Sequence, residues 1–133
     1  MKLTSRCEYA LLALVYLARQ KQEDYISVAT ISSIQNIPEK FLEQILLTLK
    51  RAKYLRSLKG NKGGYALAKP AHEINLAEII RLFDGALAPT ESVSTYFYEP
   101  TPIEKEKNLI CIFKEIRDYI AEKLEKTTLA DIC

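Results

Sequence analysis

The sequence has 133 residues, of which 48% are hydrophobic and 27% are charged. This hydrophobic share suffices for a packed core and excludes a chain that is disordered throughout. No apolar run approaches the roughly 20 residues that cross a bilayer, and the N-terminus lacks a secretory signal pattern, so we expect a soluble, cytoplasmic protein without membrane contact. Cys7, Cys111 and Cys133 are an odd, unclustered set, which argues against a disulfide framework and against a Cys-x-x-Cys metal site.

The net charge of +2 conceals an uneven distribution of charged residues. Residues 1–69 contain 12 Lys and Arg against 5 Asp and Glu, whereas residues 70–133 contain 7 against 12, so the two parts carry +7 and −5. A basic N-terminal part fits a surface that contacts phosphate, and the acidic part would be repelled from nucleic acid.

Two helices are predicted before residue 36. The first runs over about residues 5–20, begins at a capping box of Ser5 and Glu8, and places Cys7 on its apolar stripe. The second is short, is capped by Ser27 and ends near residue 35. Its inward residues are expected to be Val28, Ile31 and Ile34.

A third helix begins at Pro38, which is favourable at a first helical position, and runs to about residue 53. Its apolar stripe consists of Phe41, Leu42, Ile45, Leu46 and Leu49. The opposite face carries basic, acidic and amide side chains. Two helices joined by a tight turn are typical of a helix-turn-helix, in which the second of the pair enters the major groove of DNA.

A basic hairpin is predicted directly after the third helix. Residues 55–59 and 65–68 form its two strands, and the turn between them holds three of the four glycines of the chain, Gly60, Gly63 and Gly64. Taken alone, such a hairpin is more often a surface loop with solvated lysines. Because it follows a helix-turn-helix, the pattern indicates a winged helix-turn-helix that binds DNA.

The remaining chain is predicted to contain two helices and an irregular segment. A capping box of Asn75 and Glu78 opens a helix that Gly85 ends, and the last long helix covers about residues 103–126. We therefore divide the chain into a DNA-binding domain (1–85), an irregular connecting or sensor loop (86–102), and a dimerisation helix with a C-terminal segment (103–133). The fold class is mainly α with a small β-wing.

The long helix is too long to be covered by the small domain alone, so we expect it to pair with the same helix of a second subunit. Packing across the first helix of its own chain is the alternative. The residues predicted to form the dimer interface are Leu109, Ile112, Phe113, Ile116, Ile120 and Leu124.

Five segments together resemble the Rrf2 family of bacterial transcriptional regulators, and the resemblance covers nearly the whole chain. They are MKLTSRCEYALLALVYLA, IPEKFLEQILLTLKRAKYL, KGNKGGYALAKP, INLAEIIRLFDG and TTLADI. The resemblance implies a homodimer with crossed long helices and a winged helix at each end, bound to a pseudo-palindromic operator in double-stranded DNA.

The resemblance also implies which residues contact DNA. The positions that match the base-reading residues of the family are Lys40, Glu43, Gln44 and Lys59. A glutamate accepts from the cytosine amino group, a glutamine pairs with adenine and a lysine donates to guanine, each worth about 1–3 kcal/mol of discrimination. The residues expected at the DNA backbone or in the minor groove are Thr4, Ser27, Arg51, Arg56, Asn61, Lys62, Gly63, Gly64 and Tyr65.

The chain departs from the family pattern where cluster-binding members carry three closely spaced cysteines, because residues 86–110 contain none. We therefore expect no cofactor and no metal. An unusual iron–sulfur site that joins Glu8 of one subunit to Cys111 of the other is an alternative, although thiolates normally dominate such sites. Two other sensing elements remain open: Cys111 or Cys133 as redox thiols, or the aromatic, proline-rich stretch 89–102 as a receptor for a small molecule or a protein co-regulator.

The sequence thus favours a dimeric, sequence-specific DNA-binding regulator, a repressor that responds to a redox, metal or metabolite signal. The alternative is a protein-interaction module of winged-helix fold that docks a metabolic enzyme or another regulator. An enzyme is not expected, because no nucleophile–base pair, phosphate-binding loop or metal-ligand cluster is recognisable.

Overall fold

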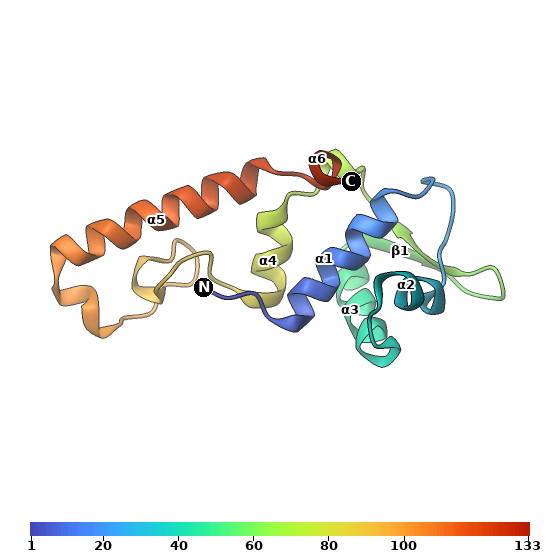
Figure 1. Ribbon diagram of the computed structural model, residues 1–133, viewed down its shortest axis with the longest axis horizontal. Helices are drawn as coiled ribbons and strands as arrows, with labels where there is room; N and C mark the ends of the chain where they lie inside the picture. The colour runs from blue at the N-terminus through green and yellow to red at the C-terminus, as the bar shows by residue number, and fades with distance from the viewer.

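The computed structural model describes all 133 residues and shows an elongated molecule with helices at both ends and one small sheet (Figure 1). The winged helix-turn-helix lies at one end, and the start of the long helix α5 lies at the other. No helix is both long and apolar enough to span a membrane. The helices are α1 (Ser5–Ala18), α2 (Val28–Gln35), α3 (Glu39–Arg51), α4 (Leu76–Asp84), α5 (Lys107–Lys126) and α6 (Leu129–Ile132); the strands are β1 (Leu55–Leu58) and β2 (Gly64–Leu67).

Helix α1 begins at Ser5, and its N-terminal cap is Thr4, one residue before the predicted cap. The Thr4 side chain, not that of Ser5, accepts from the backbone N–H of Cys7, at 3.2 Å. The predicted capping box of Ser5 and Glu8 is therefore wrong. Thr4 also donates its backbone N–H and its hydroxyl to the Asp84 carboxylate, which fixes the start of α1 to the end of α4.

The main core lies between α1, α2, α3 and the base of the wing. Its fully buried members include Leu14, Ile31, Leu46 and Leu49, which the helical spacing predicts. The spacing was wrong at Ile34, which is 57% exposed, and at Phe41, which is 51% exposed. Each lies at the edge of the apolar stripe of its own helix, Ile34 on α2 and Phe41 on α3, and the neighbouring elements do not cover these edges.

The turn between α2 and α3 is tight because Asn36 adopts a left-handed conformation (φ 55°) and ends α2. Ser27 caps the start of α2 as predicted, accepting from the Thr30 N–H at 3.1 Å. Pro38 is the N-terminal cap of α3 instead of its first residue. These two helices, with the short link between them, form the predicted helix-turn-helix.

The wing is an antiparallel pair in which Leu55 faces Leu67 and Leu58 faces Gly64. An isolated bridge between Ile26 and Tyr65 attaches the chain before α2 to the outer side of β2. A Cβ at Gly63 would lie 2.1 Å from the Leu58 carbonyl oxygen, and one at Gly64 would lie 2.1 Å from the Ile26 carbonyl oxygen. Only glycine fits at these two positions, because the backbones approach so closely.

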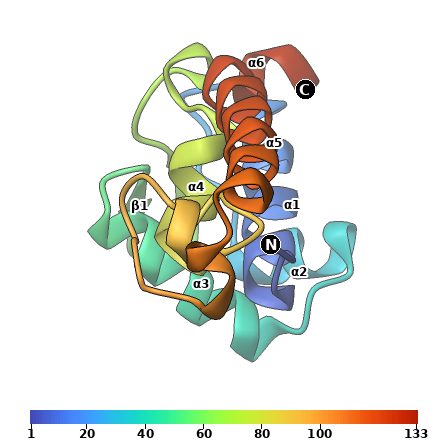
Figure 2. The same ribbon diagram turned by 90° about the vertical axis from the view of Figure 1, so that its left-hand side faces the viewer.

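Helix α4 lies between α1 and α5 and connects the two ends of the molecule (Figures 1 and 2). It begins at the predicted capping box: the Asn75 side chain accepts from the Glu78 N–H, and the Glu78 carboxylate accepts from the Asn75 N–H, each at 2.9 Å. Gly85 ends the helix with φ 82°.

The segment 86–102 forms a compact loop against α5. It contains a short 3-10 turn, Glu91–Val93, and the Arg117 side chain of α5 donates to the Val93 carbonyl oxygen at 2.9 Å. A second 3-10 turn, Pro102–Lys105, precedes α5, so the long helix begins at Lys107 and not near residue 103. Its 20 residues correspond to about 30 Å.

The C-terminal segment leaves α5 and returns to the winged domain. Thr128 forms a bridge with Asn75, and the Leu129 N–H donates to the Ile74 carbonyl oxygen at 2.9 Å. The Leu129 side chain is fully buried in the main core. Residues 127–133 therefore pack with 1–85, although the sequence division groups them with the long helix.

Candidate DNA-binding surface

The outer face of α3 is polar and free. Lys40, Glu43 and Gln44 are three and four residues apart, so they share one side of the helix, and all three are exposed. The structure contains three ion pairs, and none of them involves these residues. The side chains are available to an external partner because the opposite side of α3, with Leu42 and Ile45, is fully buried.

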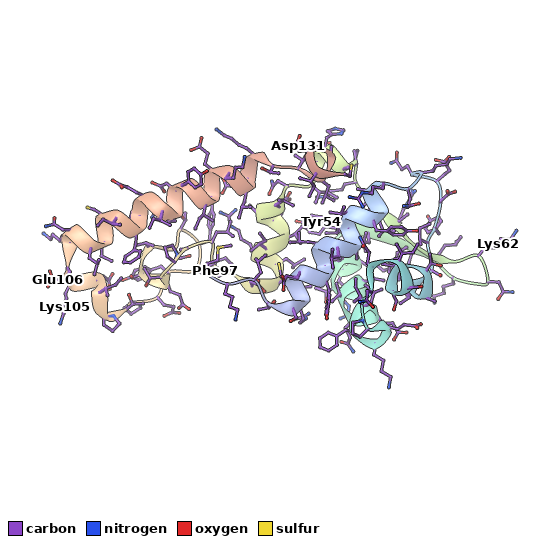
Figure 3. All side chains as sticks on the ribbon, viewed as in Figure 1. Tyr54, Lys62, Phe97, Lys105, Glu106 and Asp131 are labelled. Atoms are coloured by element: carbon purple, nitrogen blue, oxygen red, sulfur yellow. The ribbon has the colours of Figure 1, made fainter.

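The wing carries the second group of free polar residues. Lys59, Asn61 and Lys62 are exposed, and Lys62 lies at the tip of the wing, far from the N-terminal end of α5 (Figure 3). Arg51, in the last turn of α3, is also exposed and outside every ion pair. Together with α3, the wing therefore presents cationic and hydrogen-bonding groups over one end of the molecule.

Other predicted contact residues are engaged within the chain. The Arg56 guanidinium donates to the Gln22 carbonyl oxygen at 2.5 Å and lies 5.3 Å from the centre of the Tyr25 ring, so it connects the wing to the loop after α1. The Gly63 N–H donates to the Gly60 carbonyl oxygen at 3.0 Å, inside the wing turn. Tyr65 is half-buried, and its backbone pairs with that of Ile26.

Thr4 and Ser27 both serve as helix caps. Each hydroxyl accepts from a backbone N–H of its own helix and donates to a second side chain, Asp84 in one case and Thr30 in the other. Their hydroxyl hydrogens are therefore not free for phosphate.

Sequence reasoning missed Arg6 and Phe41. With Lys40 and Gln44 they line a shallow cavity of about 350 Å³ between the start of α1 and the start of α3. The Arg6 guanidinium lies 5.4 Å from the centre of the Phe83 ring, and Phe41 contacts Tyr9 edge-on, with ring centres 6.2 Å apart. Helical spacing assigned Phe41 to the core, whereas the cationic Arg6 beside the predicted base-reading residues is visible only in three dimensions.

The predicted dimer residues of α5 divide into two sets. Phe113, Ile120 and Leu124 pack inward, against the loop and α4. The predicted residues that face outward are Leu109, Ile112 and Ile116. Tyr119, which was not predicted and is 73% exposed, extends them to a set of four that recurs at intervals of three and four residues along one stripe. We call this set the α5 stripe; nothing in the chain covers it.

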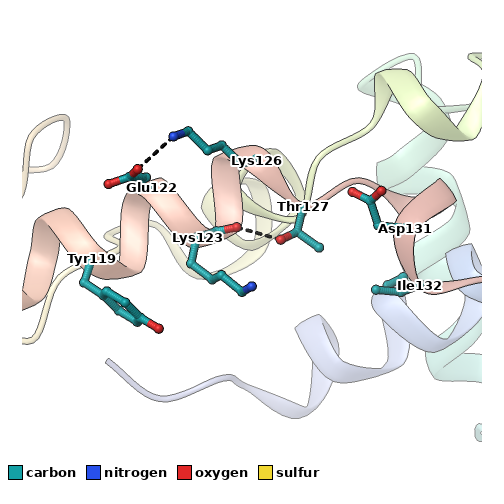
Figure 4. A pocket seen from close by; sticks show the side chains of 7 residues that line it. All are labelled: Tyr119, Glu122, Lys123, Lys126, Thr127, Asp131 and Ile132. Atoms are coloured by element: carbon teal, nitrogen blue, oxygen red, sulfur yellow. Dashed lines mark hydrogen bonds and ion pairs between the residues drawn. The ribbon is translucent and has the colours of Figure 1, made fainter.

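A cavity of about 690 Å³ continues the α5 stripe toward α6 (Figure 4). It is lined by Tyr119, Glu122, Lys123, Lys126, Thr127, Asp131 and Ile132. Lys126 donates to Glu122 at 2.7 Å on its rim, and this contact lowers the pKa of the Glu122 carboxyl. Tyr119 belongs both to the stripe and to the lining of this cavity, so the two are adjacent.

The fold and this surface define a winged helix-turn-helix transcriptional regulator, and the predicted fold class is confirmed by solved structures. The chain matches CymR (YrzC), the global cysteine regulator of B. subtilis, with a TM-score of 0.85 and 29% identity, covering 99% of this chain and 95% of that one. The T. potens IscR structure matches with a TM-score of 0.76 and 26% identity, over 99% of this chain and 85% of that one.

The family model for Rrf2, described as an iron-dependent transcriptional regulator, matches residues 3–133, and the chain belongs to this family. B. subtilis CymR is 30% identical over 132 residues, 99% of this chain and 89% of that protein. An HTH-type transcriptional regulator of Mycobacterium tuberculosis is 33% identical over 135 residues, 99% of this chain and 81% of that protein. The relatives are regulators and not enzymes, as predicted.

The family description implies an iron site, and the side chains within a single chain do not form one. No set of three or more His, Cys, Asp or Glu side chains is arranged to hold a metal ion. Cys7 is buried in α1, whereas Cys111 on α5 and Cys133 after α6 are exposed. Glu8 is exposed on α1, and its pairing with Cys111 of a second subunit stays a prediction.

Proposed function

We propose that this regulator is a homodimeric repressor that binds a two-fold-symmetric DNA operator in the cytoplasm. Each α3 enters the major groove, where Lys40, Glu43 and Gln44 read base edges, and each wing lies along the phosphate backbone. A dimer bound in this way covers the operator and blocks transcription from it.

One observation carries this proposal: the polar face of α3 and the tip of the wing are exposed together, outside every ion pair, on a helix whose other side is fully buried. A helix that only stabilised the fold would not need a lysine, a glutamate and a glutamine side by side on its free face. Lys59, Lys62 and Arg51 add the positive charge that a phosphate backbone requires.

The α5 stripe supports the dimer. Its spacing of three and four residues is that of a helix seam, and two-fold packing of one stripe on its copy buries the same residues on both subunits. Two winged domains are then held at the opposite ends of a paired helix, as recognition of two half-sites requires.

The proposal is tested by titrating labelled genomic fragments from the neighbourhood of the gene, with fluorescence anisotropy at several salt concentrations. We expect one fragment to bind at least a thousandfold more tightly than bulk DNA. Lys62→Ala should weaken all fragments alike and reduce the salt slope by about one, whereas Gln44→Ala should relax base preference. Lys105→Ala, at the far end of the molecule from Lys62 (Figure 3), is the matched control and should change neither.

The proposal fails if no fragment binds more tightly than bulk DNA at moderate salt. It also fails if Lys62→Ala and Lys105→Ala have the same effect on the salt slope.

We further propose that the chain senses its signal without the three-cysteine iron–sulfur cluster. The arrangement of its thiols supports this, since Cys7 is buried, Cys111 lies on α5 and Cys133 lies after α6. The absorption spectrum of anaerobically purified protein tests the point. Visible bands that bleach on reduction would contradict it.

A further inference from the structure

A shallow cavity of about 460 Å³ lies where the loop 86–102 meets the end of α4. It is separate from the DNA-binding surface and from the α5 stripe. Its lining residues are Asp84, Gly85, Ala86, Glu91, Tyr96, Phe97, Tyr98 and Glu99. Figure 3 shows Phe97 in this loop, beside α4.

The charged side chains that line the cavity are all negative, although the Arg81 guanidinium lies against the Tyr96 ring in its wall. Three of its lining residues are carboxylates, and none is a lysine, arginine or histidine. Glu91, Glu99 and Asp84 take part in no ion pair, and Asp84 accepts from the uncharged N–H and hydroxyl of Thr4. Helix α4 ends here, and the C-terminal carbonyl groups of a helix add partial negative charge. A cation is therefore the charge class that the cavity favours.

Aromatic rings form the rest of the wall. Tyr96, Phe97 and Tyr98 are all exposed, although aromatic side chains of this size are usually covered. The Arg81 guanidinium lies 4.9 Å from the centre of the Tyr96 ring, so one ring of this group already holds a cation in the fold. Aromatic faces attract organic cations because the ring quadrupole is negative over the face.

The arrangement of the carboxylates disfavours a bare metal ion. Asp84, Glu91 and Glu99 are not grouped closely enough to coordinate one, since no set of three such ligands exists in the structure. A larger cation with its charge spread over carbon-bearing groups contacts separated carboxylates and ring faces at once. We propose that this cavity binds an organic ammonium compound, held by the ring of Tyr98 and by the carboxylates of Glu91 and Glu99, while the Tyr96 ring stays with Arg81.

The test is isothermal titration calorimetry of the DNA-free protein with choline and with cadaverine, as quaternary and primary ammonium probes. Their neutral counterparts, dimethylbutanol and pentanediol, have similar size and no charge. At least one ammonium probe should bind roughly tenfold or more tightly than its counterpart, a difference of about 1.4 kcal/mol. Magnesium and ferrous ions, titrated separately, should give no stronger binding than the preferred ammonium probe.

Matched variants locate the site. Glu99→Gln and Tyr98→Leu should each weaken the preferred probe by roughly tenfold, whereas Tyr98→Phe, which keeps the ring, should retain it. Glu73→Gln, on the exposed turn before α4, is the control and should change nothing. All three positions are exposed, so the four variants are expected to fold.

The inference is overturned if neither ammonium probe binds more tightly than its neutral counterpart, if a metal ion binds more tightly than both, or if Glu99→Gln and Glu73→Gln behave alike. These results leave the DNA-binding proposal untouched, because the anisotropy titration measures operator binding independently. Conversely, absence of an operator would not explain a change in ammonium affinity.

Discussion

The thiol of Cys7, on α1, is unreactive because of its surroundings. Its side chain is fully buried between α1 and α4. Burial, together with the negative charge of the neighbouring Asp84 carboxylate, raises the pKa of the Cys7 thiol to about 12. The thiol therefore stays protonated at neutral pH, and a protonated thiol is a poor nucleophile and a poor metal ligand.

This environment predicts selective labelling. Iodoacetamide at pH 8 should modify the exposed Cys133 of the folded protein and leave Cys7 unmodified, because the folded chain offers almost no Cys7 thiolate. Peptide mass spectrometry after a short reaction measures both sites in one sample. Unfolding in guanidinium chloride before labelling is the control and should expose both thiols equally. Equal labelling rates at Cys7 and Cys133 in the folded protein would show that the Cys7 thiol is not protected.

Helix α6 is short, but it attaches the C-terminal segment to the main core. It has four residues, and a capping box of Thr128 and Asp131 fixes its start. Leu129 then enters the main core, where it is fully buried beside residues of α1 and Ile74. The element attaches the end of α5 to the winged domain, because the chain on both sides of Leu129 pairs with the segment before α4.

Leu129→Ala should lower the free energy of unfolding by about 2–5 kcal/mol, because the substitution leaves a cavity in a region that is completely covered. Leu58→Ala is the matched control: the same atoms are removed from a side chain that is 50% exposed on the wing, so the loss should be much smaller. Urea unfolding followed by circular dichroism measures both. Similar losses in the two variants would mean that α6 is not part of the core.

Features that depend on contacts between residues close together in the sequence could largely be predicted. Features that depend on contacts between residues far apart in the sequence could not. The box of Asn75 and Glu78 forms as predicted, because both residues belong to one turn. Leu129 could not be assigned to the core, since its partners lie more than fifty residues away and its helix is too short to show periodicity. Phe41 was assigned to the wrong side because spacing gives the direction of an apolar stripe and not how much of it a neighbour covers.

The same limit applies to the DNA-binding surface. Spacing predicts that Lys40, Glu43 and Gln44 lie opposite the buried stripe of α3, and all three are exposed there. Their choice as base-reading residues depends on the family resemblance and stays a prediction. Arg56 looked equally available in the sequence, yet it reaches back to the Gln22 carbonyl oxygen. Arg6 was overlooked because its position beside Lys40 depends on how α1 crosses α3.

At the scale of the whole molecule, the outward side of α5 is an apolar surface that no other element covers. The helix extends away from the winged domain, contacts α4 and the loop on one side, and presents the α5 stripe on the other (Figures 1 and 2). Such a stripe is costly to leave in water, since each large apolar side chain contributes about 1.5–3 kcal/mol when it is fully buried. In the proposed dimer, a second copy of the chain would cover it without any further element.

A charge in the α5 stripe should separate the proposed dimer. Ile116→Glu places a carboxylate at the centre of the stripe, and two-fold symmetry introduces it twice, so two like charges meet without a cationic partner. Lys114→Glu, on the same helix but outside the stripe, is the matched control and should stay dimeric. Light scattering coupled to size-exclusion chromatography gives the mass of each variant at several concentrations.

The monomeric Ile116→Glu variant should lose its preference for the operator and keep its weak binding to bulk DNA, because each winged domain remains intact. A dimer of Ile116→Glu that persists at low concentration, or a wild-type protein that is monomeric, would show that the stripe is not the subunit interface.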